Sequence, residues 1–415
     1  MSSSYRDAVR LRVAVTCAVA ASVALPVTGA WGAQTYVQPR IDVRVENNDN
    51  FDLDPDGTPE GDIYGFIVDA QTLVGIFTDR SETSVRPRLR FQEYPDRDDL
   101  QRIEAFLDLR SQYNWERSEF LMIGRYALQD SYNVETPDGV FDPLDPNFGN
   151  NADSSTVLVG ETRQRLQLNP TFDHSLTERV NLGFGLNYET VSYDAEVGEP
   201  TRIDYDFTVV DGSLSWALNP QSKVGVGAYA SQFKAQDDSE ETDAFGGGVG
   251  YSYNWSEVTG VEAQLFYESN DVTINEPVRT EESTSGWGGS LTAFHKLEVS
   301  DWRFAISRTY IPTGDGGKSE SDQLRLQYNR SFSERLSILG AARYEMRNAL
   351  TETGGGDDRD YARVDLSLNW FMTQTWYVQG GYSYIWLDRQ TAAGDADNNR
   401  LFVSVGYQGL RRQRR

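Results

Sequence analysis

Residues 35–407 form a long series of runs in which apolar and polar residues alternate. In residues 182–189 the even positions carry Leu, Phe, Leu and Tyr, and the odd positions carry Gly, Gly, Asn and Glu. Residues 261–268 and 362–370 repeat this pattern. An alternation of period two predicts β-strands with one apolar and one polar face. The links between the runs are short and long in turn, which is typical of an up-and-down barrel.

The apolar face of these strands needs a cover. A soluble sheet would need a second layer, whereas a closed single-layer barrel can leave its apolar face to lipid. We therefore predict an all-β fold, a closed antiparallel up-and-down transmembrane β-barrel of about 18 strands, in which one misread hairpin would give about 16 or 20. A mean hydropathy of -0.55 and the lack of a long apolar run after residue 33 argue against a bundle of membrane helices.

The N-terminus has the pattern of an export signal. Arg6, Arg10 and Arg12 precede an apolar stretch over residues 13–27, and small residues follow it up to a predicted cleavage site between Ala30 and Ala33. The sequence thus predicts a signal peptide (1–33), an outer-membrane barrel (34–408) and a basic C-terminal tail (409–415), in the bacterial outer membrane. The single cysteine lies within this leader, so no disulfide is expected in the exported chain.

The chain is strongly acidic, with a formal net charge of -25. Such a charge excludes a nucleic-acid binder. Four acids, Asp54, Asp56, Glu60 and Asp62, could gather a divalent cation such as Ca²⁺, although Ile63 stands where a helix-loop-helix calcium site needs a glutamate. A solvated acidic loop is the alternative, and no other cofactor is predicted.

Arginines recur on the polar face of several predicted strands. Arg86, Arg88 and Arg90 would follow one wall at steps of about 7 Å, twice the rise of a strand. The full set of pore-lining basic residues is Arg40, Arg44, Arg86, Arg88, Arg90, Arg102, Arg110, Arg163 and Arg165. This basic ladder would favour anionic solutes. Alternatively it is a structural network, because Asp42, Glu46, Glu104 and Asp108 share the register.

The longest predicted loop covers residues 133–154 and contains no Lys or Arg. Its acids are Glu135, Asp138, Asp142, Asp145 and Asp153. Folded inward, this loop would set acidic groups opposite the arginines and narrow the pore. An outer surface loop is the alternative, because long outer loops are common in such barrels.

Six tryptophans fall near predicted short turns, where a periplasmic aromatic girdle would lie. They are Trp115, Trp216, Trp255, Trp302, Trp370 and Trp376. The chain has only two histidines and no nucleophile elbow or zinc spacing, so no enzyme is predicted.

Residues 39–51 (PRIDVRVENNDNF), followed by Asp54-Pro55-Asp56-Gly57, resemble the start of the β-barrel porin 2 family of bacterial outer-membrane proteins. The hairpin rhythm of residues 219–233 and 245–257 is similar to the repeating hairpins of that family. The resemblance implies an outer-membrane barrel often associated with exopolysaccharide synthesis and export loci. Barrels of this kind usually end on an aromatic residue, whereas here residues 409–415 follow Tyr407.

The leading functional hypothesis is an outer-membrane channel, either a porin or the outer conduit for exopolysaccharide export. A second hypothesis is a loop-plugged barrel that binds polysaccharide or anchors the envelope, and a third is a soluble exported β-propeller or carbohydrate-active enzyme. The expected partners are outer-membrane lipid, the barrel-assembly machinery, polysaccharide and periplasmic export components, with no nucleic acid.

Overall fold

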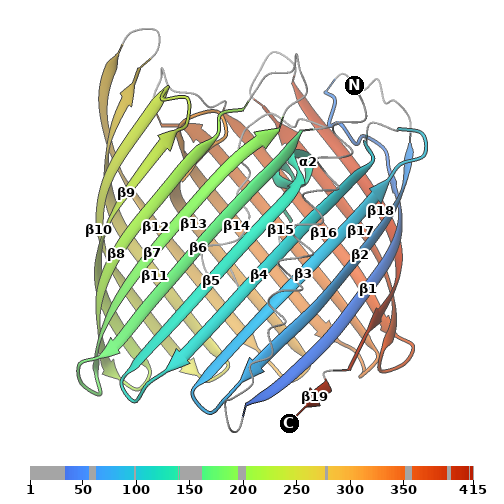
Figure 1. The fold of residues 1–415 in the computed structure, drawn as a ribbon, viewed down its shortest axis with the longest axis horizontal. Coiled ribbons are helices and arrows are strands. Elements are labelled where there is room, and N and C mark those ends of the chain that lie inside the picture. The colour runs from blue at the N-terminus through green and yellow to red at the C-terminus, as the bar shows by residue number, and fades with distance from the viewer. Residues whose placement is uncertain are drawn as a thin grey trace.

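The strands close into a single barrel (Figure 1). The computed structural model describes residues 33–55, 62–97, 100–138, 140, 161–194, 202–275, 279–350, 358–389, 394–410 and 412–414, so the predicted signal sequence lies outside the described residues except for Ala33. Each barrel strand is antiparallel to the next, and β1 pairs with both β2 and β18, which closes the sheet. The predicted antiparallel barrel with 18 strands is confirmed.

The barrel strands are long, as tilted membrane strands must be. Their bounds are β1 Gln34–Asn48, β2 Ile63–Phe77, β3 Ser81–Glu93, β4 Arg102–Asn114, β5 Ser118–Asp130, β6 Thr162–Ser175, β7 Val180–Asp194, β8 Tyr205–Asn219, β9 Ser222–Ala235, β10 Glu240–Ser256, β11 Thr259–Ile274, β12 Thr280–Lys296, β13 Ser300–Pro312, β14 Lys318–Ser331, β15 Leu336–Ala349, β16 Arg359–Phe371, β17 Trp376–Asp388 and β18 Asp395–Gln408. A short helix, α2 (Ser131–Glu135), follows β5. No helix among the described residues is long and apolar enough to cross a membrane.

Short turns join the strands at one rim, which we call the periplasmic rim, and longer connections join them at the other, the outer rim. The C-terminal tail also reaches the periplasmic rim (Figure 1). Its residues form β19 (Arg412–Arg414), which pairs with Thr35, Tyr36 and Val37 at the start of β1. The predicted tail therefore extends the closing seam of the barrel.

The outer face of the barrel is an apolar belt. On β16, Val364, Leu366, Leu368 and Trp370 are exposed, whereas the alternating polar residues face the lumen. The six tryptophans beside the short turns are all exposed as well, as an aromatic girdle requires. A protein that exposes so large an apolar surface needs lipid around it.

On the inner face, aromatic rings lie flat against glycines of the neighbouring strand. Tyr377 faces Gly406 across the β17–β18 ladder, and a Cβ atom at Gly406 would lie 2.1 Å from the ring carbon Cζ of Tyr377. The Tyr377 hydroxyl donates to Asp42 and accepts from Arg40, each at 2.9 Å, so the ring is fixed in place. These contacts join β17, β18 and β1 at the closing seam.

We expect Gly406→Val to destabilise the barrel by about 1–3 kcal/mol, the usual cost of overpacking a filled site. The temperature at which the folded band disappears in heat-modifiability gels measures the effect. Gly340→Val is the matched control, because a Cβ there meets only Leu366, at 3.9 Å. Equal midpoints for the two variants would contradict the packing role of the glycine.

Candidate channel lumen

The lumen has one wall rich in ion pairs, which we call the charged wall. On its β3–β4 part Arg86 lies 2.7 Å from Asp108, and Arg90 lies 3.1 Å from Asp69 and 3.2 Å from Glu104. These pairs form because the antiparallel register places Arg86 opposite Asp108 and Arg90 opposite Glu104. Both partners of each pair therefore lie on the lumen face.

The other residues of the predicted basic ladder have several kinds of partner. Arg102 pairs with Asp130 at 2.9 Å, and Arg163 and Arg165 lie 3.9 and 2.6 Å from Glu189. Arg88 lies 3.9 Å from Asp69, with its guanidinium over the ring of Phe106. Arg40 donates to the Tyr377 hydroxyl, Arg44 stacks over Phe402, and Arg110 donates to Gln112. Asp42 and Glu46 accept hydrogen bonds from the hydroxyls of Tyr377 and Tyr94.

A segment after β5 turns into the lumen from Ser131, two residues before the predicted loop of residues 133–154 begins. The Asp130 side chain accepts a hydrogen bond from the Tyr132 amide and caps α2, so the chain leaves the ladder at Ser131. Residues 136–138 and 140 then reach strands far along the sequence. Arg363 donates to the carbonyl of Thr136, and the Tyr361 hydroxyl donates to the carbonyl of Pro137.

The inward segment, which we define as the described residues 131–138 and 140, is held by a buried ion-pair cluster. Glu135 is fully buried and lies 2.9 Å from Arg359 of β16 and 3.2 Å from Arg202 before β8. Arg202 also lies 3.2 Å from Glu161, and burial raises the pKa of this carboxyl although Arg202 opposes the shift. Unpairing such buried charges is expensive, so the cluster fixes the segment in the lumen.

Two details differ from the sequence interpretation of this loop. The partners of Glu135 are Arg359 and Arg202, not the Arg86–Arg90 ladder, because the segment crosses the lumen toward β14–β16. Asp138 is exposed, and the other predicted acids, Asp142, Asp145 and Asp153, lie outside the described residues.

A second arginine cluster lines β14–β16, and the sequence interpretation missed it. Arg343 and Arg347 lie 2.6 and 3.0 Å from Glu345, which sits between them on the same strand face. The full set is Arg325, Arg343, Arg347, Arg359 and Arg363, all buried. Arg343 and Arg347 on β15, like Arg359 and Arg363 on β16, are four residues apart and so share one strand face, which is the signal that could have found them.

The connection between β13 and β14 also leans over the lumen. The Gly314 carbonyl accepts from the Ile203 amide at 2.8 Å, and the Lys318 ammonium lies 3.0 Å from Glu268 and donates to Asn270 at 2.8 Å. Strands β12 and β13 pair only between Gly289–Arg308 and Lys296–Asp301, so nearer the outer rim they part. The outer half of the lumen is therefore narrowed from two sides.

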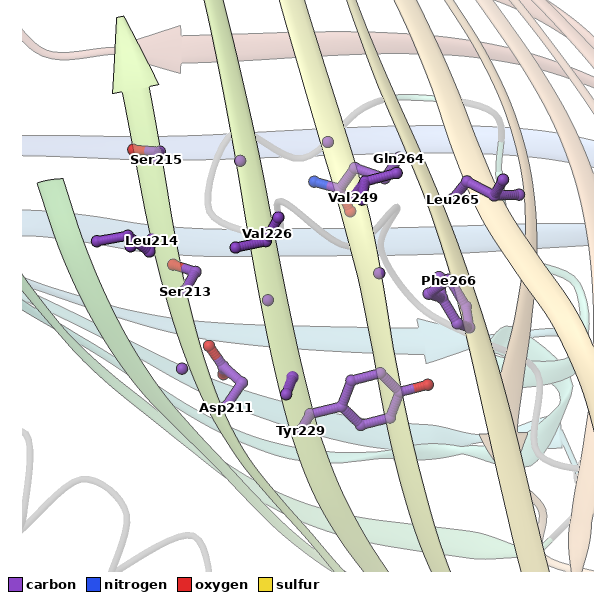
Figure 2. A pocket seen from close by; sticks show the side chains of 16 residues that line it. Asp211, Ser213, Leu214, Ser215, Val226, Tyr229, Val249, Gln264, Leu265 and Phe266 are labelled. Carbon is purple, nitrogen blue, oxygen red and sulfur yellow. The ribbon is translucent and has the colours of Figure 1, made fainter. Parts of the chain in front are cut away.

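The opposite wall, on β8–β11, carries small side chains and is called the small-residue wall here. Serines and glycines such as Ser213, Gly227 and Gly248 leave a recess of about 370 Å³, which Tyr229 and Phe266 also line (Figure 2). In the part of the chain that the structure describes, this wall therefore leaves space open beside it.

The predicted cation site is only partly within the described residues. Asp54 and Asp62 are described, whereas Asp56 and Glu60 are not. Among the described residues no group of three or more His, Cys, Asp or Glu side chains is arranged to hold a metal ion. The acidic loop as a calcium site stays a prediction.

A closed 18-strand barrel with an apolar outer belt, short turns at one rim and a polar lumen is an outer-membrane barrel of the porin type. This architecture places the chain in the bacterial outer membrane, because only there do such barrels of one chain span a bilayer in bacteria.

The matches of this chain to known proteins are all to solved structures. No family model matches the chain, and no curated protein sequence matches it. Among solved structures, OpdL of Pseudomonas aeruginosa is 12% identical over 91% of this chain and 99% of its own, with a TM-score of 0.41. OpdK of the same organism, solved with vanillate, is 11% identical over 90% and 98% (TM-score 0.42). OccAB4 of Acinetobacter baumannii is 10% identical over 91% and 98% (TM-score 0.43).

Proposed function

We propose that this protein is a narrowed diffusion channel for small hydrophilic solutes. The observation that carries the proposal is the inward segment, which leaves β5 and is anchored on β14–β16 by Glu135, Tyr361 and Arg325. A barrel of about 18 strands is too wide to be filled by its wall side chains alone. A segment fixed across the bore sets the size of what passes, as a constriction does. Ion conductance of the purified protein in planar bilayers tests the proposal.

The charged wall gives the channel a preference among solutes. Arg40 and Arg110 face the lumen and donate to the Tyr377 hydroxyl and to Gln112, neither of which is a carboxylate. Arg44 stacks over Phe402 and has Glu46 and Asp42 as electrostatic neighbours. Rings of charged side chains set ion selectivity through the local potential. We therefore propose a preference for solutes with an anionic group.

We expect the triple substitution of Arg86, Arg88 and Arg90 by Gln to shift the reversal potential under a salt gradient toward cation preference. Asp69, Glu104 and Asp108 would lose their positive partners and dominate the local potential. Arg308→Gln is the matched control, because this arginine pairs with Asp322 on the outer face of the barrel. An unchanged reversal potential in the conducting triple variant would mean that the three arginines do not border the ion path.

No observation favours a conduit for exopolysaccharide. A polymer needs an open bore, whereas the inward segment and the β13–β14 connection both occupy the outer half of the lumen. The alternative is a fully plugged barrel that binds polysaccharide. Ion conductance distinguishes the two, because a plugged barrel would not conduct. The barrel-assembly machinery and outer-membrane lipid are the partners that a barrel of this class requires.

A further inference from the structure

The recess in the small-residue wall is a pocket with a definite set of lining residues. The recess extends across the inner faces of β8, β9, β10 and β11. Glycines form most of its floor. A Cβ atom at Gly248 would lie 2.4 Å from the Leu265 carbonyl oxygen, so this position tolerates no side chain. The volume of about 370 Å³ falls at the small end of the range of roughly 300–1,000 Å³ found for small-molecule sites.

Two aromatic rings bound the recess. The Tyr229 and Phe266 rings are 6.0 Å apart at 78°. Each lies over a glycine of the next strand, because Cβ atoms at Gly246 and Gly288 would lie 2.2 Å from ring carbons of Tyr229 and Phe266. The tips of both rings therefore lie over the backbone of the next strand, and the two rings meet edge to face. Figure 2 shows the Tyr229 side chain between Asp211 and Phe266.

The polar side chains of the recess differ from those of the charged wall. Asp211, Ser213 and Gln264 are exposed, and within the described part of the chain none of them has a side-chain hydrogen bond or an ion pair to another residue. Their hydrogen-bonding groups are therefore available to a solute. No Lys or Arg lines the recess, which makes it a poor site for an anion.

We propose that this recess is a saccharide-binding subsite that holds a neutral pyranose ring. One face of a pyranose carries C–H groups, which pack on aromatic rings such as Phe266 and Tyr229. Its edge carries hydroxyl groups, which donate to the Asp211 carboxylate and exchange hydrogen bonds with Gln264 and Ser213. The inference adds a substrate class to the proposed channel and rests on that proposal only for access through the lumen.

The test is saturable block of ion current by maltose in planar bilayers, together with saturation-transfer NMR of maltose on the detergent-solubilised barrel. We expect wild-type protein to bind maltose in both assays. Phe266→Ala and Asp211→Ala should each raise the half-blocking concentration about tenfold or more, which corresponds to about 1.4 kcal/mol of binding free energy.

A variant that fills the recess tests the subsite without removing any side chain that would contact maltose. Gly225→Leu should abolish the block without harming assembly, because a Cβ at Gly225 meets its nearest neighbours at an ordinary 3.6 Å. Phe294→Ala is the control: Phe294 covers Gly260 on the inner face in the same way, but it does not line the recess. This control should bind maltose within about twofold of wild type.

Three results would overturn the subsite. They are an absence of maltose binding by NMR in the folded barrel, an equal loss in Phe294→Ala, and binding of tetramethylammonium in place of maltose, which would indicate a cation site. Maltose binding by NMR in a barrel that never conducts would support the subsite and remove the channel proposal instead.

Discussion

Leu366→Arg and Leu186→Arg are expected to abolish most membrane assembly, whereas Asn187→Arg is expected to assemble nearly as well as wild type. Leu366 and Leu186 are exposed on the lipid face of β16 and β7, and Asn187 is the next residue along β7, on the lumen face. An arginine near the middle of the lipid face costs about 2–4 kcal/mol, whereas the lumen tolerates charge. At that cost the folding equilibrium falls by more than about tenfold.

The fraction of heat-modifiable barrel in outer-membrane preparations measures this difference. Asn187 tests the same strand at the same depth, so differences in expression or export are shared with Leu186→Arg. Equal folded fractions for the three variants would contradict the assignment of faces on which the whole account of the lumen depends.

The strands could be predicted from the sequence because a barrel wall has a local signature. The alternation in residues 362–370 identifies β16 and its two faces, and the short and long links identify the two rims. That signal needs only neighbouring residues. The alternation over residues 362–370, for example, lies within the observed β16.

The contents of the lumen could not be predicted in the same way. Glu135 and Arg359 are 224 residues apart, and nothing in the local sequence of either one points to the other. The departure of the chain at Ser131 depends on one capping side chain, Asp130, in a run that otherwise reads as strand. Pairing of Arg86 with Asp108 likewise depends on the cross-strand register, which alternation alone does not fix.

The parting of β12 and β13 near the outer rim also has no local signal. Both strands read as ordinary alternating runs, although they pair only between Gly289–Arg308 and Lys296–Asp301. Nearby, Lys318 pairs with Glu268 of β11 and Gly314 accepts from the Ile203 amide. Tertiary contacts of this kind override the local preference for continued pairing.

Removal of residues 136–152 is expected to widen the channel and to raise its single-channel conductance several-fold. This deletion takes out the part of the inward segment that contacts Tyr361, Arg363 and Arg325, while the strand ladder of β5 and β6 stays intact. Assembly should be preserved because loops contribute little to the ladder. Arg363 and Arg325 would then face water in a wider lumen, which limits the cost of losing the carbonyls of Thr136 and Val140.

Shortening the exposed β9–β10 connection (236–239) is the matched control, because its residues lie at the outer rim and make no contact with the inward segment among the described residues. It should leave the conductance and the size of the largest admitted solute unchanged.

Single-channel conductance in planar bilayers, recorded for wild type and for the 136–152 deletion, tests the central claim most directly. Wild type is expected to conduct with small unitary steps, and the deletion variant is expected to give steps several-fold larger and to admit larger neutral polymers. Equal steps in the two proteins, or no conductance in either, would contradict a channel narrowed by the inward segment.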